Sequence, residues 1–263
     1  MKIDGKALAD KILNDLSLEV VKLKEKGVTP TLAVIQIGDD PGSTAYIRQK
    51  QKSAEQIGAK LILNHQLSTI SNQNLQIIIE QYNNDPGIHG LIVQRPLPKN
   101  LHAEYIRLSK DVDGFLINSP YPIPVVSAVL TILGDRIHSK KIVVIGRGET
   151  AGKPIAEAFI KLGSHVTVIH SQTTNTDDII KTGDIVISCV GKPNVVRRDN
   201  IKTSAILISV GLSRDSKGKL HGDYEEEEIK DVASLYTPTP GGVGPVNVAC
   251  LMANLINAVG KLL

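Results

Sequence analysis

The chain has 263 residues, of which 41% are hydrophobic and 22% charged, and its formal net charge is +3. A chain of this size can bury a sizeable core in one large or two ordinary domains. Its basic residues are dispersed and have no aromatic residues interleaved with them, so we expect no nucleic-acid partner. We also expect no membrane partner, because no apolar run approaches the roughly 20 residues that a membrane span needs.

The cysteine content indicates a reducing compartment. Cys189 and Cys250 are far apart in the sequence, and each has apolar neighbours. Such cysteines are more often reduced core residues than partners in a disulfide. The N-terminus opens on an amphipathic helical pattern and not on a signal peptide, so we expect a cytoplasmic protein.

Helical periods and short β-rich runs alternate through the first half of the chain. In order, the sequence predicts a helix over 4–26 ended by Gly27, a strand over 31–38, a helix after the turn GDDPGST, a strand over 60–65, a helix near 72–83 and a strand over 89–94. This alternation is typical of a doubly wound, mostly parallel sheet. The stretch INSPYPIP, residues 117–124, has three prolines and indicates a domain boundary.

A second alternating series follows the proline-rich stretch. It comprises a connecting helix over 127–134, strands over 140–146, 164–170, 183–191 and 204–211, a helix over 153–163, a loop or hairpin in SRDSKGKLHGD, a helix that begins in the acidic run 225–228, and a long apolar helix over 243–263. We therefore expect an α/β protein with two domains, residues 1–120 and 121–242, and a last helix that packs back onto the first domain.

Lys50 lies on a helix face that is otherwise mostly apolar. Ser43 or Thr44 is the expected cap of this helix, and Gly58 is the expected stop. Residues four apart share a helix face, so Lys50 is expected to point inward. One face carries Tyr46, Lys50, Ala54 and Ile57, and the opposite face carries Arg48, Lys52, Glu55 and Gln56. The alternative is a lysine whose aliphatic stem runs out to solvent.

A glycine-rich turn follows the predicted strand that ends in IVVIG. Gly146, Gly148 and Gly152 are spaced one residue wider than the G-x-G-x-x-G fingerprint of dinucleotide-binding folds. Glycines at such a turn let the backbone approach a pyrophosphate at a helix N-terminus. The alternative is a turn that needs glycine only for packing.

The end of the next strand indicates which dinucleotide is bound. NAD enzymes usually have Asp or Glu there, to bind the ribose 2′-hydroxyl. This chain has His170 and Ser171 instead, and Arg147 lies in the glycine turn. Because no carboxylate repels a 2′-phosphate and an arginine can pair with one, we expect NADP rather than NAD.

Four short segments, in this order, match one family. They are GDDPGSTAYIRQKQK with its Tyr-x-x-x-Lys pair, GLIVQRPLP (90–98), KDVDGF (110–115) and TPTPGGVGPVNVACLM (237–252). Together they resemble the bifunctional methylenetetrahydrofolate dehydrogenase/methenyltetrahydrofolate cyclohydrolase family, from about residue 1 to the C-terminus. The resemblance implies an N-terminal αβα catalytic domain, a C-terminal Rossmann-like NADP domain and an active-site cleft between them.

The resemblance also implies two reactions of one-carbon metabolism, in the service of purine biosynthesis. A hydride passes from 5,10-methylenetetrahydrofolate to NADP, and water then opens the methenyl product to 10-formyltetrahydrofolate. The first step needs only a nicotinamide held in line with the donor carbon, whereas the second needs proton transfers.

The family's site residues carry over to matching positions. Lys50 corresponds to the catalytic lysine, which acts as a base only if burial or a positive neighbour disfavours its ammonium form. Gln94 corresponds to the glutamine beside the lysine, Tyr46 to the aromatic residue that packs on the folate, and Asp113 to the acid that binds the pterin ring. Asp111 is expected to cap its own loop.

Further binding residues follow from the same resemblance. The substrate would contact Pro240, Gly241 and Gly242, although these glycines could also form a plain turn. No histidine or cysteine spacing indicates a metal site. The family also implies tetrahydrofolate derivatives as ligands and a homodimer. The residues implied for NADP are Gly146, Arg147, Gly148, His170, Ser171, Gly191 and Leu212.

The chain departs from the family near the nicotinamide region. Most members carry Pro-Cys-Thr-Pro before the connecting helix, whereas this chain reads YPIPVVSAVLTIL, with Val125 and Val126 in place of polar contacts. The loop after KDVDGF is also shorter, Gly-Arg-Gly replaces Gly-Arg-Ser, and Val246-Asn247 stands where Met-Thr is common. A monofunctional cyclohydrolase and a non-catalytic folate- or NADP-binding paralogue therefore stay open. A hydroxy-acid dehydrogenase would leave the Gln94 and Asp113 segments unexplained.

Overall fold

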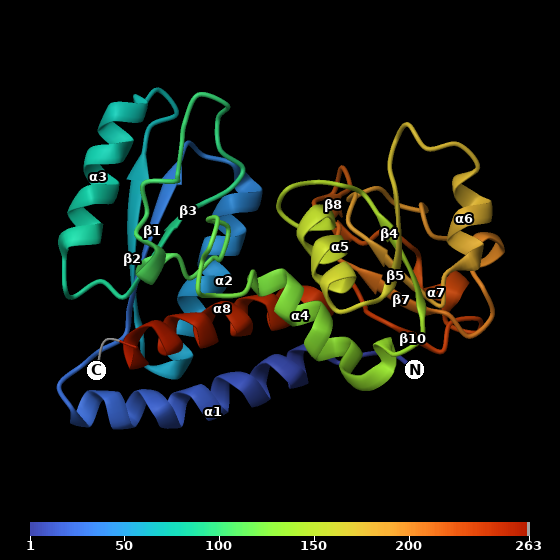
Figure 1. Ribbon diagram of the computed structural model, residues 1–263, viewed down its shortest axis with the longest axis horizontal. Coiled ribbons are helices and arrows are strands. Elements are labelled where there is room, and N and C mark those ends of the chain that lie inside the picture. Colours follow the sequence, from blue (N-terminus) through green and yellow to red (C-terminus); the bar gives the residue numbers. More distant parts are fainter. Residues whose placement is uncertain (262–263) are drawn as a thin grey trace. The chain divides into compact units, whose positions relative to one another are not determined.

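The computed structural model describes residues 1–261, which divide into two compact units. The small-sheet unit consists of Ala9–Pro124 together with the C-terminal stretch from Val248. The large-sheet unit consists of Met1–Leu8 and Val125–Asn247. Each unit has its own parallel sheet (Figure 1).

The small-sheet unit has the predicted alternation of strands and helices. Its sheet has the order β2-β1-β3, and both pairings are parallel. The fold class expected for this part of the chain is therefore confirmed. The elements in chain order are most of α1 (Gly5–Glu25), β1 (Thr31–Ile37), α2 (Pro41–Ile57), β2 (Lys60–Gln66), α3 (Asn72–Asn84), β3 (Gly90–Val93), the short 3₁₀ helix η1 (Leu108–Lys110) and most of the last helix, α8 (Val243–Gly260).

Helices cover both faces of this sheet. Successive side chains of a strand point to opposite faces. Leu32 and Val34 of β1 pack in one cluster with side chains of α1, α2 and α8. Ala33 and Ile35 pack in a second cluster with α3. The strand is buried on both sides, which explains why its sequence is a continuous apolar run.

The large-sheet unit has the strand order β10-β7-β6-β4-β5, and all its pairings are parallel. Helix α5 contacts β4 and β5, and α6 contacts β4; Figure 1 shows these helices on opposite sides of the sheet. Its elements are α4 (Pro124–Leu133), η2 (Gly134–Ile137), β4 (Lys141–Ile145), α5 (Gly152–Lys161), β5 (His165–Ile169), α6 (Thr176–Thr182), β6 (Ile185–Ser188), η3 (Arg198–Asn200), β7 (Ile206–Ser209), β8 (Ser213–Arg214), β9 (Leu220–His221), α7 (Glu226–Ile229) and β10 (Leu235–Tyr236).

Three details differ from the sequence-based expectations. The connecting helix begins at Pro124, because proline fits the first turn of a helix. Helix α6 and strand β10 were not predicted. The last helix ends at Gly260, and residues 262–263 of its predicted span lie outside the described residues.

Helix α8 is apolar because much of it lies in the core. Among residues 1–261 it is the helix whose length and composition would allow it to cross a membrane, but 67% of that window is buried. Met252 and Leu255 belong to the cluster formed with α1 and α2. Asn254 is also buried, and its side-chain amide donates to the backbone carbonyls of Val112 and Pro122, at 2.8 Å each. The apolar sequence of α8 is therefore explained by its burial in the core.

Candidate functional site

The helix that carries Lys50 begins one turn earlier than expected. Its cap is Asp40, whose Oδ2 accepts the backbone N–H of Ser43 at 2.7 Å, and Pro41 occupies the first helical position. The prediction of Ser43 or Thr44 as the cap was therefore wrong. The hydrogen bond from Ser43 lowers the pKa of Asp40.

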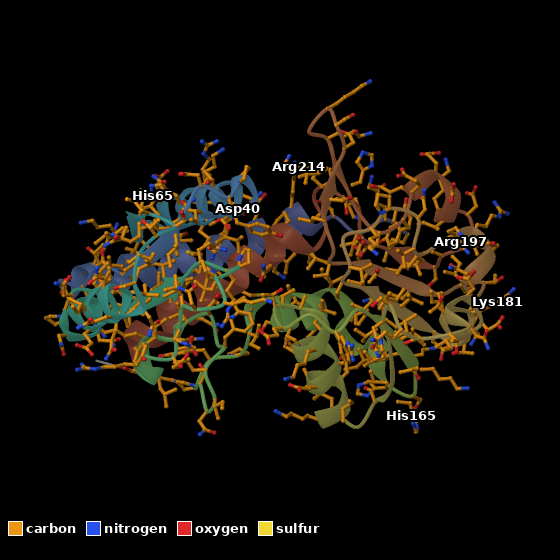
Figure 2. The ribbon with its side chains drawn as sticks, turned by 90° about the horizontal axis from the view of Figure 1, so that it is seen from above. Asp40, His65, His165, Lys181, Arg197 and Arg214 are labelled. Carbon is orange, nitrogen blue, oxygen red and sulfur yellow. The ribbon has the colours of Figure 1, made fainter. Side chains whose placement is uncertain are left out.

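Asp40 and His65 lie on the same side of the unit (Figure 2), and Nε2 of His65 is 3.0 Å from the carbonyl oxygen of Gly38.

Lys50 is buried and hydrogen-bonded. Its exposed fraction is 7%, and its Nζ donates to Oε1 of Gln94 at 2.8 Å. Burial lowers the pKa of Lys50, and the carboxylate of Asp113 opposes that shift. The alternative in which the lysine runs out to solvent is wrong. A lysine in such surroundings can be neutral closer to neutral pH than an exposed one.

Gln94 holds its side-chain oxygen toward Lys50. Its backbone N–H continues the pairing of β3 by donating to Ile35 at 2.8 Å. Its Nε2 donates to the carbonyl oxygen of Arg95 at 2.9 Å, so the amide cannot flip without losing this bond. The guanidinium of Arg95 in turn stacks 4.8 Å from the ring centroid of Phe115. The amide is thus fixed as an acceptor for the lysine.

Two further predicted residues lie in the same unit as Lys50. Tyr46 is one helical turn before the lysine and is half-buried, and burial raises its pKa. Asp113 is half-buried and close enough to influence Lys50 electrostatically. The structure therefore brings Asp113 to the Lys50–Gln94 pair, and it places Tyr46 on the same helix face as the lysine.

Asp111 holds the loop that presents Asp113. It is 3% exposed, and its Oδ2 accepts the backbone N–H of Leu116 at 3.0 Å. The hydroxyl of Ser119 donates to its carbonyl oxygen at 3.2 Å. Burial raises the pKa of Asp111, while the hydrogen bonds from the loop oppose the shift. These contacts are those of a loop cap, as the sequence predicted.

The glycine turn after β4 is tightly closed. A Cβ on Gly152 would lie 2.2 Å from the carbonyl oxygen of Gly146, so any other residue there would force the backbone to shift. A Cβ on Gly148 would meet nothing within 4 Å. Gly152 therefore serves the packing of α5 against the strand, and Gly148 leaves open backbone that a pyrophosphate could approach.

Arg147 reaches the end of β5. One of its terminal nitrogens donates to Oε1 of Gln172 at 3.1 Å. The backbone N–H of Gln172 lies 3.3 Å from Nδ1 of His170. The backbone N–H of His170 donates to the hydroxyl oxygen of Thr173 at 3.0 Å. Ser171 is exposed between them. The predicted residues Arg147, His170 and Ser171 are thus brought together, and Gln172 is a member of the group that the sequence reasoning missed.

Gly191 and Leu212 meet where β6 and β7 end. Gly191 has a φ of 62°, and a Cβ there would lie 2.7 Å from the carbonyl oxygen of Leu212. Cys189, just before this loop, carries a free thiol and is half-buried rather than fully buried, and burial raises its pKa. The loop also packs against the glycine turn, because a Cβ on Gly146 would lie 2.9 Å from the Val190 side chain. The predicted cofactor residues of this unit therefore all lie at the carboxyl ends of its strands.

The Pro240–Gly242 loop is fixed by the start of the chain. Gly241 has a φ of 98°, which favours glycine. A Cβ on Gly5 would lie 2.0 Å from the carbonyl oxygen of Gly242, so the two segments are in direct backbone contact. Gly5 is a structural requirement that sequence reasoning missed, since a glycine at a helix start carries no distinctive signal.

The residues that the structure describes contain no group of three or more His, Cys, Asp or Glu placed to hold a metal ion. The chemistry of the two units is therefore that of a buried lysine with an amide and a carboxylate, and of a glycine turn with an arginine. These features define an α/β enzyme with a dinucleotide-binding sheet.

Comparison with known proteins identifies the family. The profile described as "Tetrahydrofolate dehydrogenase/cyclohydrolase, catalytic domain" matches residues 3–113, and the profile of the NAD(P)-binding domain of the same family matches residues 122–262. The chain therefore belongs to the tetrahydrofolate dehydrogenase/cyclohydrolase family. The predicted family and the dinucleotide cofactor are confirmed.

Relatives match over almost their whole length. The chain is 40% identical to the bifunctional protein FolD of Lactococcus lactis subsp. cremoris (strain MG1363), covering 98% of this chain and 96% of that protein. It is 42% identical to FolD of Halalkalibacterium halodurans, covering 97% of each. A crystal structure of the bifunctional FolD enzyme of Campylobacter jejuni superposes with a TM-score of 0.94 at 33% identity, covering 100% and 99% of the two chains.

A Trypanosoma brucei methylenetetrahydrofolate dehydrogenase-cyclohydrolase, whose structure is a complex with NADP and an inhibitor, superposes with a TM-score of 0.93 at 32% identity. The superposition covers 98% of the Trypanosoma brucei chain and 100% of this chain.

Proposed function

We propose that this chain oxidises 5,10-methylenetetrahydrofolate with NADP and hydrolyses the methenyl product to 10-formyltetrahydrofolate. The observation that carries the proposal is the buried Lys50, hydrogen-bonded to a neutral amide at 2.8 Å. A lysine buried beside an amide is poised to exchange protons near neutral pH. Membership in the family supplies the reaction class.

Lys50 is assigned as the base of the hydrolysis. Water adds to the methenyl carbon and gives a proton to the neutral amine. The ammonium so formed returns this proton to the ring nitrogen as its bond to carbon breaks. The hydroxyl of the adduct loses its own proton as the formyl C=O forms, so the overall reaction releases a proton. Proton transfer by a positioned side chain accelerates such steps about 10²- to 10⁴-fold.

The neighbours of Lys50 divide the remaining tasks. Gln94 accepts a hydrogen bond from the lysine and orients it, and an amide does so without stabilising the ammonium as strongly as a carboxylate would. Asp113 is assigned to the N–H donors of the pterin ring. Tyr46 is assigned to packing on the folate, and Pro240, Gly241 and Gly242 to backbone contacts with the substrate.

The large-sheet unit fits a dinucleotide. When bound, NADP accepts the hydride of the first reaction. Gly148 leaves the backbone at the start of α5 open to a pyrophosphate, and Gly146 and Gly152 allow the close packing of the turn that presents it. Arg147 presents a charged donor at the end of β5, where His170 and Ser171 leave no carboxylate to repel a 2′-phosphate. Gly191 and Leu212 are assigned to the same cofactor.

The domain assignment follows the same division. Residues 1–120, with the last helix, are assigned to the folate and to the hydrolysis, and residues 121–242 to NADP. The compact units divide between Pro124 and Val125, within a few residues of that boundary, although Met1–Leu8 belong to the large-sheet unit. We also assign the protein to the cytoplasm as part of this proposal.

A homodimer is proposed with β5 as its contact edge. The opposite edge strand, β10, is covered by the first residues of the chain, since Ile3 donates to the carbonyl of Tyr236 at 2.9 Å. Strand β5 has no neighbour on its outer side within the described residues. Val168 of β5, Ile160 of α5 and Leu162, which caps α5, are exposed, and open apolar edges of this kind favour pairing. Val168→Lys is expected to shift the mass measured by light scattering from dimer to monomer.

The test of the proposed function follows both reactions separately. Methenyl formation is measured with purified protein, methylenetetrahydrofolate and NADP or NAD, and methenyl decay is measured in a separate run without dinucleotide. Both activities, with higher catalytic efficiency for NADP, are the expected result. Decay without formation would identify a monofunctional cyclohydrolase, the alternative suggested by the missing Pro-Cys-Thr-Pro stretch. Folate binding without either activity would identify a non-catalytic paralogue.

A further inference from the structure

Asp223 is a fully buried carboxylate that the proposed reactions do not use. Its exposed fraction is 0%. It lies between the end of the β8–β9 hairpin and α7, in a segment with no regular secondary structure. A buried carboxylate is costly unless it is hydrogen-bonded, so its partners indicate what it is for.

The partners of Asp223 are the backbone amides of the loop after β6. Its Oδ1 accepts the N–H of Lys192 at 2.8 Å, and its Oδ2 lies 3.3 Å from the N–H of Val190. Its backbone carbonyl accepts the N–H groups of Val195 and Val196, at 3.1 Å each. One residue thus fixes both ends of the 190–196 loop.

The sheet in turn anchors Asp223. Its own N–H donates to the hydroxyl of Ser209, at the end of β7, at 2.9 Å. A Cβ on Gly211 would lie 2.4 Å from the Asp223 carboxylate and 2.3 Å from the amide nitrogen of Gly191. The space around the carboxylate is therefore filled, and the loop has no room to shift toward it.

The loop that Asp223 holds belongs to the edge where a dinucleotide is expected. In parallel α/β sheets, ligands bind beyond the carboxyl ends of the strands. The loop follows β6, and Val190 packs directly against Gly146 of the glycine turn. A change in its conformation would therefore reach the cofactor site.

We propose that Asp223 is a positioning residue for NADP, acting through the Val190–Lys192 loop. Without the carboxylate, two backbone N–H groups lose their acceptor, and the loop samples conformations that do not bind the cofactor. Binding then carries the added cost of ordering the loop. This inference rests on the proposed dehydrogenase function, but it concerns binding and not the hydride transfer.

The test uses the full chain and two substitutions. Asp223→Asn keeps the shape and one acceptor, and Asp223→Ala removes both acceptors. The dissociation constant of NADP is measured by calorimetry, alongside the KM for NADP, the kcat, and the rate of methenyl hydrolysis without dinucleotide. Each lost hydrogen bond to a buried amide corresponds to roughly a 10- to 100-fold change, so we expect the dissociation constant and the KM to rise about 10-fold in Asp223→Asn and about 100-fold in Asp223→Ala.

Matched variants separate positioning from general stability. Tyr224 is adjacent and also buried, and its hydroxyl donates to the carbonyl of Thr237 at 2.6 Å, away from the 190–196 loop. Tyr224→Phe is expected to lower the melting temperature and to leave the NADP dissociation constant within about twofold of wild type. Asp231→Asn, at an exposed position of the same unit, is expected to change neither. Methenyl hydrolysis should persist in all soluble variants, because Lys50, the assigned base, lies in the other unit and none of the substituted residues is assigned to the substrate.

Two outcomes overturn different statements. If Asp223→Asn binds NADP as tightly as wild type, Asp223 is not a positioning residue, whatever the activities are. If the wild type binds NADP but catalyses neither reaction, the proposed function fails while the binding comparison still decides the role of Asp223. Should Asp223→Ala not fold, Asp223→Asn decides alone.

Discussion

The Nζ of Lys50 lies 2.8 Å from Oε1 of Gln94, and the other end of that amide is already engaged, since its Nε2 donates to the carbonyl of Arg95. The lysine is therefore the donor in this pair in both of its protonation states. The amide neither removes its proton nor stabilises its charge as strongly as a carboxylate would. Burial then has the larger influence on the pKa of Lys50, and it lowers that pKa against the opposing charge of Asp113.

Lys50→Met should abolish most of the methenyl hydrolysis. The substitution keeps the stem of the side chain and removes the base, so the rate is expected to fall by about 10²- to 10⁴-fold, with the NADP dissociation constant nearly unchanged. The measurement is methenyl decay by absorbance. Lys52→Met, on the exposed face of α2, is the control and should keep its activity. Hydrolysis at the wild-type rate in Lys50→Met would show that another group transfers the proton.

Gln94→Glu should move the pH dependence of hydrolysis upward. A carboxylate at 2.8 Å would stabilise the ammonium form and raise the pKa of Lys50. The neutral amine would then be available only at higher pH, so the rate near neutral pH is expected to fall while the alkaline rate recovers. A pH–rate profile measures this shift. Gln56 is exposed on α2, the helix that carries Lys50, so Gln56→Glu should leave the pH–rate profile unchanged. An unshifted profile in Gln94→Glu would contradict the assignment of Lys50 as the base.

The burial of Lys50 should also appear in the stability of the protein. Because the pKa of Lys50 is lowered on folding, the unfolded chain binds more protons than the folded one between the lowered pKa and the ordinary lysine value of 10.5. Stability of the wild type should therefore rise with pH across that window, relative to Lys50→Met. Urea unfolding of both proteins at several pH values measures the difference. Parallel curves would mean that the lysine is not desolvated in the folded state.

The two glycines of the turn after β4 should behave differently. Gly152→Ala places a Cβ 2.2 Å from the carbonyl of Gly146 and is expected to destabilise the unit by about 1–3 kcal/mol, the usual cost of overpacking. Gly148→Ala meets nothing within 4 Å, so its melting temperature should match the wild type while its NADP affinity falls. Thermal unfolding and calorimetry together measure both effects. If Gly148→Ala bound NADP normally, Gly148 would not be a cofactor contact.

Arg147→Leu should reduce the preference for NADP over NAD. A charge-assisted hydrogen bond contributes about 1.5–3 kcal/mol, so the ratio of catalytic efficiencies is expected to fall about 10- to 100-fold. The efficiency with NAD should change little, because NAD has no 2′-phosphate. Arg198→Leu is a suitable control, since Arg198 is exposed in the same unit. An unchanged ratio would assign the discrimination between NADP and NAD to another residue. Gln172 is the next candidate, because its side-chain oxygen accepts a hydrogen bond from the Arg147 guanidinium.

The parts of the fold that depend on repeated patterns could be predicted from the sequence. Apolar runs such as 31–37 and the helix face of Lys50 follow from burial, and each was found where expected. The cap of α2 was not, because both the Asp40 and the Ser43 side chains can cap a helix and only the backbone decides between them. Helix α6 is seven residues long and β10 is two, so neither has a period that could be recognised.

Residues that act through the backbone of distant segments were missed for a different reason. Gly5 matters because it touches Gly242, and Asp223 because it binds the 190–192 amides. Neither contact has a local sequence signal. Arg147 and His170 could be anticipated, since Arg147 directly follows one predicted strand and His170 ends the next, whereas Gln172 could not, because its role depends on the direction of the arginine side chain.

The packing of α8 has a consequence for how the protein is made. Leu13 and Val20 of α1 lie in the same cluster as Met252 and Leu255 of α8, although they are separated by nearly the whole chain. During translation the strands of the small-sheet unit leave the ribosome long before this helix does. The part of their apolar face that α8 covers stays exposed until that helix is made, and exposed apolar surface of this kind is what chaperones bind. The small-sheet unit, whose strands are made early, therefore completes its core only when α8 has been synthesised.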